Sequence, residues 1–256
     1  MMQISFDQID YIPKLLDLRA KETNPSYNRQ SLIRISAEIA SCYFMKEELG
    51  PARDWAARSL SYADDFFFGP WRDMIPYGGN SPLPPPHRQA WFKNEGWITE
   101  LQVSLVWGSA LGEWDFIRKL AGYFQDGVSG NCGQSESNYS WWLLLTGILQ
   151  GRDPQELAPY REKIENGRGR ARNEQLLLNF LDTICQGSDQ EVHAASRKLF
   201  SAAAKQDFKN QDFFYPMLCE GSFLVHYTRH RGRPLTIPES IMDRIVTFDK
   251  WETSAS

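Results

Sequence analysis

The sequence has few cysteines and no long apolar run, and both absences exclude classes of protein. Its four cysteines, Cys42, Cys132, Cys185 and Cys219, are widely and irregularly spaced. Small secreted scaffolds carry dense cysteine frameworks and zinc sites carry close pairs, so neither class fits. The longest apolar run, residues 141–145, is far shorter than the ~20 residues that span a bilayer. Residues 1–7 lack the basic and apolar regions of a signal peptide, so we expect a cytoplasmic protein that does not enter a membrane.

An excess of basic residues is lacking as well. The 256-residue chain has 28 Lys and Arg against 32 Asp and Glu, which gives a formal net charge of -4. Proteins that bind a phosphate backbone need a dense Lys and Arg footprint, so we do not expect nucleic acid as the partner. Hydrophobic residues make up 42% of the chain, which is enough apolar surface to bury a core and excludes a disordered chain.

Local signatures of common catalytic sites are also absent. The chain contains no Walker-type phosphate loop, no GxGxxG or GxSxG motif and no HExxH metal motif. Each of these is a short local pattern, so its absence is informative. The sequence therefore predicts no catalytic, cofactor-binding or metal-binding residue.

What the sequence has in abundance is helical periodicity. Apolar residues recur at i, i+3, i+4 and i+7, the spacing that gives a helix one apolar face, and no convincing run alternates like a strand. We therefore predict an all-α fold. The six clearest stripes are Leu32/Ile35/Ile39/Tyr43, Ala52/Ala56/Leu60/Ala63/Phe67, Trp97/Leu101/Leu105/Leu111, Leu177/Phe180/Leu181/Ile184, Val192/Ala195/Leu199/Ala202 and Phe214/Met217/Gly221/Val225/Thr228.

Four joints between these stripes have the form of a tight turn between helices. In each, Gly follows an apolar stripe, and a proline, acidic or capping residue precedes the next helix. At the first joint, Gly50 is predicted to end one helix and Pro51 to open the next in its first turn. The other joints are residues 111–113, 150–154 and 186–189. Their unequal separations exclude the fixed period of a tetratricopeptide or ankyrin array, so we predict an irregular stack of antiparallel helical hairpins.

Two long segments interrupt the helical pattern. Residues 69–92 are rich in proline, which is incompatible with regular helix, and they carry Trp71, Tyr77 and Trp91. Residues 125–138 are rich in Gly, Ser and Asn. Long loops inside a compact domain are usually functional or disordered. We predict a single helical domain over 1–250, made of an N-terminal hairpin at 29–68, a Pro-rich aromatic loop at 69–92 and a main helical body at 93–247, with a frayed tail at 251–256.

One pair of residues has the spacing of a metal site. His226 and His230 lie four residues apart and therefore on one face of a helix. No third ligand is identifiable, and Arg229 and Arg231 crowd the same end with positive charge. The other interpretation fits better: these are cationic side chains at a helix C-terminus that Gly232 closes.

Three segments of the second half share their order with a known family. Residues 110–114 lead into Leu120 and Ala121, residues 181–189 open the helix at 190–204, and a late helix at 218–232 precedes Ile237 and Pro238. This order resembles that of the helical immunity proteins of bacterial polymorphic-toxin systems, in particular the immunity protein 49 family. The resemblance covers roughly half of the chain, from about Trp107 onward.

The resemblance implies a non-enzymatic cytoplasmic protein that binds a cognate toxin without a cofactor or metal. Such binding needs a rigid scaffold with a complementary surface, on which aromatic and Arg anchors supply most of the affinity. Within that framework, the candidate contacts are the aromatic side chains Trp71, Tyr77 and Trp91. Asp126 and Glu136 are the candidate charge partners for a basic toxin.

Two alternatives stay open. The first is a helical scaffold that serves another protein complex. The second is a helical enzyme, whose site would join Glu100, His226 and His230 in a deep pocket.

Overall fold

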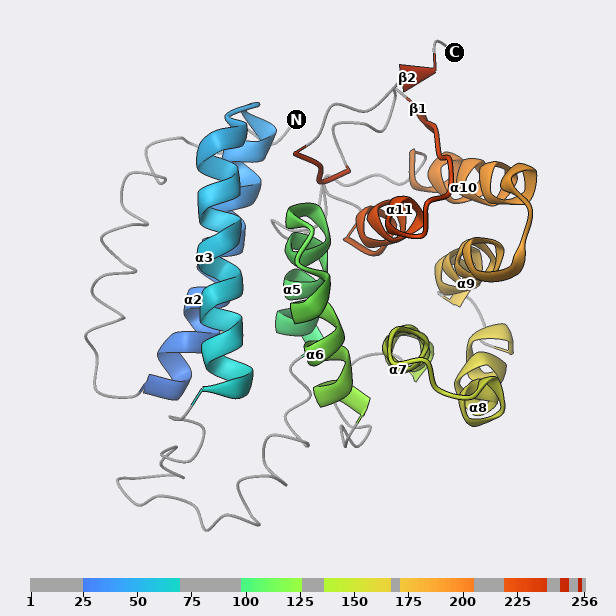
Figure 1. Cartoon of the computed structure of the whole chain (residues 1–256), viewed down its shortest axis with the longest axis horizontal. Coiled ribbons are helices and arrows are strands. Elements are labelled where there is room, and N and C mark those ends of the chain that lie inside the picture. The colour runs from blue at the N-terminus through green and yellow to red at the C-terminus, as the bar shows by residue number, and fades with distance from the viewer. Residues whose placement is uncertain are drawn as a thin grey trace.

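The computed structural model describes residues 25–69, 98–125, 136–166, 171–204, 219–238, 245–248 and 253–254. Within these ranges the chain forms nine α-helices and one pair of two-residue strands (Figure 1). The prediction of an all-α fold is therefore confirmed. None of the described helices is long and apolar enough to cross a membrane.

The first eight described helices form four hairpins in chain order. The α2/α3 hairpin lies at one end of the stack and packs against α5, α6 packs against α7, and α8 packs against α9 (Figure 1). Helix lengths range from 12 to 21 residues, so no repeat of fixed length exists among them. The predicted irregular stack of hairpins is confirmed. The pairs are α2 (Pro25–Met45) with α3 (Leu49–Phe68), α5 (Ile98–Leu111) with α6 (Trp114–Gln125), α7 (Glu136–Leu149) with α8 (Pro154–Glu165), and α9 (Ala171–Gln186) with α10 (Asp189–Ala204).

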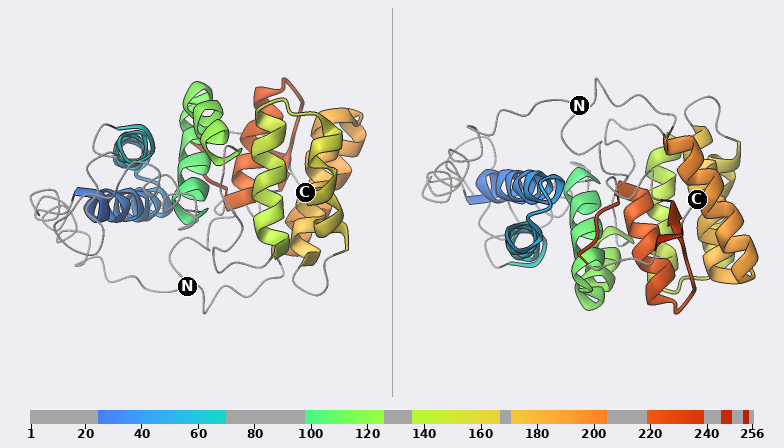
Figure 2. Two further views of the ribbon diagram at one scale, coloured as in Figure 1. Left: turned by 90° about the horizontal axis from the view of Figure 1, so that it is seen from below. Right: turned by 90° about the horizontal axis from the view of Figure 1, so that it is seen from above.

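The ninth helix, α11 (Cys219–His230), does not continue the stack at its far end. It returns between hairpins that precede it in the chain and packs against α5 and α9, as Figure 2 shows from two sides. Phe223, Leu224 and Val225 are fully buried there. Helices α5 and α11 are distant in sequence, and their contact joins the second hairpin to the last helix within one core.

Three of the four predicted turns lie where the sequence places them. Gly112 and Gly151 adopt positive φ angles of 80° and 67°, the left-handed conformation in which glycine is unstrained. At each, the amide after the glycine donates to a carbonyl five residues earlier, as from Glu113 to Gly108 at 2.8 Å, which is the Schellman pattern. Helix α8 then begins with a capped end, because the Asp153 side chain accepts from the Gln155 amide at 2.7 Å.

The remaining turn, which is the first in the chain, lies three residues earlier than we predict. Helix α2 ends at Met45, and the left-handed residue is Glu47, with φ 62°, instead of Gly50. The Glu48 amide donates to the Tyr43 carbonyl at 3.0 Å, which completes the same Schellman pattern. Gly50 and Pro51 lie inside the first turn of α3, where an amide has no helical acceptor and proline costs nothing. The turn therefore forms at a residue that the glycine rule does not select.

One hydrophobic core runs through all four hairpins and α11. Its largest fully buried side chains include Trp107, Trp141 and Trp142. The stripes predicted in α3 and α9 are all buried, from Ala52 to Phe67 and from Leu177 to Ile184. Helical periodicity therefore identified the core faces of these helices correctly.

Helix α2 buries two faces, whereas its predicted stripe describes one. Ile33, Ala37 and Phe44 face the main core. The predicted stripe instead forms a second, smaller cluster on the hairpin, in which Leu32 and Ile39 are buried. We call this the end-hairpin cluster; its partly buried members are Ile35, Tyr43, Trp55 and Tyr62.

Residues 245–248, here called the strap, tie α11 to the first hairpin. The Val246 amide donates to Ser222 Oγ at 3.0 Å, and the Val246 carbonyl lies 2.6 Å from His226 Nε2. The Phe248 ring stacks on Trp107 at 5.9 Å and meets Phe44 edge-on at 6.4 Å. The strap thus contacts α2, α5 and α11 together.

A short strand pair lies on either side of the strap in the sequence. Strand β1 (Ile237–Pro238) pairs in parallel with β2 (Thr253–Ser254), with Ile237 opposite Thr253. The second strand falls in the segment where we expect a frayed tail.

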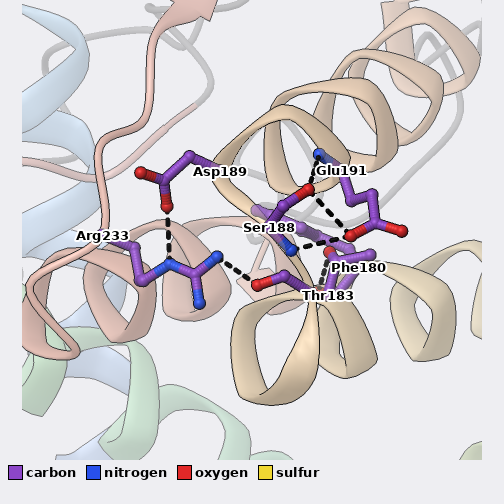
Figure 3. A network of polar contacts seen from close by, with 7 residues as sticks. Phe180, Thr183, Ser188, Asp189, Glu191 and Arg233 are labelled. Carbon is purple, nitrogen blue, oxygen red and sulfur yellow. Dashed lines mark hydrogen bonds and ion pairs between the residues drawn. The ribbon is translucent and has the colours of Figure 1, made fainter.

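The turn between α9 and α10 is fastened to the segment after α11 (Figure 3). Arg233 Nε donates to Asp189 Oδ1 at 2.9 Å, and Arg233 Nη2 donates to the Gly187 carbonyl at 2.5 Å. Ser188 and Glu191 form a reciprocal capping box, in which Glu191 Oε2 accepts from the Ser188 amide at 2.7 Å. Gly187 has no room for a side chain, because a Cβ there would lie 2.9 Å from Thr183 Cα.

Candidate partner-binding surface

The predicted contact residues fall outside the part of the chain that the structure describes. This holds for Trp71, Tyr77, Trp91 and Asp126. Glu136 begins α7, but its side chain also lies outside the described set. Their role as contacts of a partner protein stays a prediction.

The two histidines of α11 have different environments. His226 is 6% exposed and, because a carbonyl oxygen only accepts, its Nε2 carries a proton that it donates to the Val246 carbonyl. His226 therefore lies in the core against the strap and not at the exposed end of the helix. His230 is exposed in the last turn, next to Arg229, and Gly232 closes the helix with a φ of 69°. The predicted Gly232 cap is therefore confirmed, whereas the lowered pKa of His230 disfavours the cationic form that the helix-end interpretation assigns to it.

The hypothesis of an enzyme site invoked Glu100 together with these histidines. Glu100 is 1% exposed and accepts from Arg34 Nε at 2.5 Å, an ion pair that links α2 to α5. A buried carboxylate needs such a partner to stay charged. Across the described residues, no group of three His, Cys, Asp or Glu side chains could hold a metal ion.

A carboxylate pair that the sequence analysis missed lies where α9 and α11 begin. Glu174 and Glu220 occupy the first turns of these helices, and Glu174 is 8% exposed. Burial raises the pKa of Glu220, and the nearby charge of Glu174 raises it further. Both effects favour the protonated form of Glu220 over its charged form.

The described surface carries aromatic rings paired with basic side chains. The Arg58 guanidinium lies 4.8 Å from the Trp55 ring, on the end-hairpin cluster. Lys119 Nζ lies 4.0 Å above the Phe68 ring, where α6 meets α3. These two are cation–π contacts, in which the positive charge is attracted to the face of the ring. A third contact joins α6 to α11 and is a stack of two rings.

The pair between α3 and α6 belongs to a half-buried aromatic group. Phe68 makes edge contacts with Phe116 at 6.5 Å and with Tyr123 at 5.9 Å. Lys119 completes it by an ion pair to Asp64 at 2.7 Å.

The pair between α6 and α11 consists of two stacked rings. The His230 imidazole lies 4.0 Å from the Trp114 ring, with 15° between their planes. The Trp114 ring also contacts the rings of Phe223 and Tyr227, whose centroids each lie 6.2 Å from its own. We call Trp114, Arg118, His230 and Arg231 the α6–α11 patch. Partial burial lowers the pKa of His230, and the positive charges of Arg118 and Arg231 lower it further.

We predict aromatic contacts with a partner in the long loops, whereas the aromatic pairs described above lie on helices. Trp55 and Arg58 are three residues apart on α3, so their proximity was visible as an i, i+3 pair. The other two pairs join residues that are distant in sequence, and only the packing of α6 against α3 and α11 brings them together.

Comparisons with known proteins add no relative. No model of a known protein family matches the chain, and no curated protein or solved structure is significantly similar to it. The resemblance to the immunity protein 49 family thus stays a prediction.

Proposed function

We propose that this chain is a non-enzymatic protein that binds and neutralises a cognate bacterial toxin in the cytoplasm, as its resemblance to the immunity protein 49 family implies. One observation carries the proposal: aromatic rings held by basic side chains stand on the outer faces of rigid helices. Trp, Tyr and Arg dominate the binding energy of protein interfaces, and pre-ordered side chains lose little entropy on binding.

The end-hairpin cluster supports the proposal further. A helix at the end of a stack needs only one apolar face, because its outer face has no neighbouring hairpin, yet α2 carries a second apolar cluster there. Trp55 and Arg58 lie on it together with Tyr43 and Tyr62. Leu32 and Ile39 are buried at its centre, but the partly exposed Tyr43, Trp55 and Tyr62 beside Arg58 have the composition of a protein-binding face.

Co-expression tests the proposal. The protein encoded by the neighbouring gene is expressed with and without this chain, and cell growth and co-purification are measured. We expect this chain to restore growth and to co-purify with that protein. If the neighbouring product neither arrests growth nor binds, the proposal fails. Capture of a housekeeping assembly from native lysate would favour the alternative of a helical scaffold.

Three single variants then locate the interface, one for each aromatic–basic pair: Arg58→Gln, Lys119→Gln and His230→Gln. Arg197→Gln is the matched control, because Arg197 is an exposed residue of α10. We expect at least one of the three to weaken toxin binding by about tenfold, as for an interface hot spot, while the control binds normally. Equal binding by all four variants would exclude these surfaces as the interface.

A further inference from the structure

The α6–α11 patch is a rigid surface built where two helix ends meet. Helix α6 begins at Trp114, directly after the Gly112 turn, and α11 ends at His230, directly before the Gly232 turn. Both turns have the backbone geometry that only glycine adopts without strain, so the helix ends are fixed in place. The stacked rings of Trp114 and His230 therefore form a flat platform of defined position.

Three arginines flank this platform, together with the exposed carboxylates of Glu113 and Asp115. Arg118 stands on α6, and Arg229 and Arg231 are exposed at the end of α11. Arg118 forms an ion pair with Asp115, whose side chain is 95% exposed. Arg231 makes no ion pair with any residue that the structure describes. The patch thus presents the Arg118 guanidinium, which already pairs with a carboxylate, and the Arg231 guanidinium, which can pair with a carboxylate of a partner.

We propose that the α6–α11 patch binds a short acidic segment of the partner protein. A carboxylate of that segment pairs with Arg231, and an apolar side chain beside it packs on the Trp114–His230 platform. The Arg118–Asp115 pair shows that a carboxylate on this surface reaches a guanidinium of the patch. The inference deepens the proposed toxin-binding function, on which it rests for the identity of the partner.

Charge decides between an acidic protein segment and a larger polyanion. The whole chain has a net charge of -4, which repels nucleic acid at long range. The positive charge of the patch is confined to a few residues, so it matches a few carboxylates and not an extended phosphate backbone.

A peptide titration tests the inference without the toxin. The probe is a Glu-Glu-Phe-Glu-Glu peptide, with Gln-Gln-Phe-Gln-Gln as the uncharged control and a single-stranded oligonucleotide as the polyanion. The readout is the imidazole resonance of His230, because the chain has four histidines and the His230→Gln variant identifies the signal. We expect the acidic peptide alone to shift this resonance and to saturate it.

Variants of the full chain complete the test. We expect Arg231→Gln to weaken peptide binding by about tenfold, because a charge-assisted hydrogen bond is lost, and Arg118→Gln to weaken it less, because Asp115 already occupies that guanidinium. Arg197→Gln, at an exposed position of α10 outside the patch, should bind like the native chain. Thermal unfolding confirms that each variant is folded.

Three results would overturn the inference. They are an acidic peptide that leaves the His230 resonance unchanged, an Arg231→Gln variant that binds as well as Arg197→Gln, and an oligonucleotide that shifts the signal as strongly as the peptide. If this chain binds the toxin but the α6–α11 patch does not bind the peptide, only this inference is wrong and the proposed function stands. If the peptide binds but the neighbouring gene product does not, the proposed function falls instead.

Discussion

Replacement of Glu47 by glycine should stabilise the protein. Glu47 is exposed and sits at φ 62°, a conformation that costs an L-residue about 1–2 kcal/mol relative to its relaxed backbone. Glycine adopts it freely but loses about 0.5–1 kcal/mol more entropy on folding. The difference leaves a net gain of about 0.5–1 kcal/mol for Glu47→Gly. For a chain of this size that gain raises the melting temperature by about 1–4 °C.

Denaturant unfolding of four variants measures the effect. Glu47→Ala is the control for loss of the side chain, since alanine keeps the Cβ that causes the strain, and it should gain nothing. Gly112→Ala and Gly151→Ala are the converse cases, because a Cβ at either glycine meets nothing within 4 Å and only backbone strain is added. Each should lose about 1 kcal/mol. The reasoning is refuted if Glu47→Gly is no more stable than Glu47→Ala.

Three further predictions concern ionisable groups. Burial raises the pKa of Cys42 to about 11, so at pH 8 a disulfide reagent should label Cys42 only after denaturant is added, as peptide mapping would show. The pKa of Glu220 is raised in the folded state, so ionisation of its carboxyl group lowers the stability of the fold as pH rises. Glu220→Gln should therefore be more stable than the native chain at pH 7 but not near pH 3. Thermal unfolding at both pH values measures the difference. The half-exposed pair of Arg161 with Asp182, joined by two bonds of 2.6 Å, should give a coupling of about 1 kcal/mol in a double-mutant cycle, and a coupling near zero would contradict the geometry.

Much of the fold follows from local patterns in the sequence. The stripe of α9 and the glycines at 112 and 151 were visible because helical period and left-handed turns depend on neighbouring residues only. Glu47 was missed because the local rule for left-handed turns selects glycine and does not select glutamate. The position of α11 beside α5 was equally out of reach, since it depends on which buried surfaces fit each other.

The candidate surface was harder to predict than the fold. The stack of His230 on Trp114 joins two helix ends that are far apart in the chain, and neither residue signals its partner. His226 looked like a possible ligand by its spacing, yet its environment is set by the Val246 carbonyl, which has no sequence signature. Side chains that meet across the fold therefore require the structure.

The strap has a consequence for how the protein is made. Val246 and Phe248 are synthesised after every helix that they touch, and they supply contacts to α2, α5 and α11 at once. While residues 245–248 are still inside the ribosome, His226 lacks its carbonyl partner and Phe44 and Trp107 lack the ring that covers them. The nascent chain must therefore carry a partly open core until these four residues have left the ribosome.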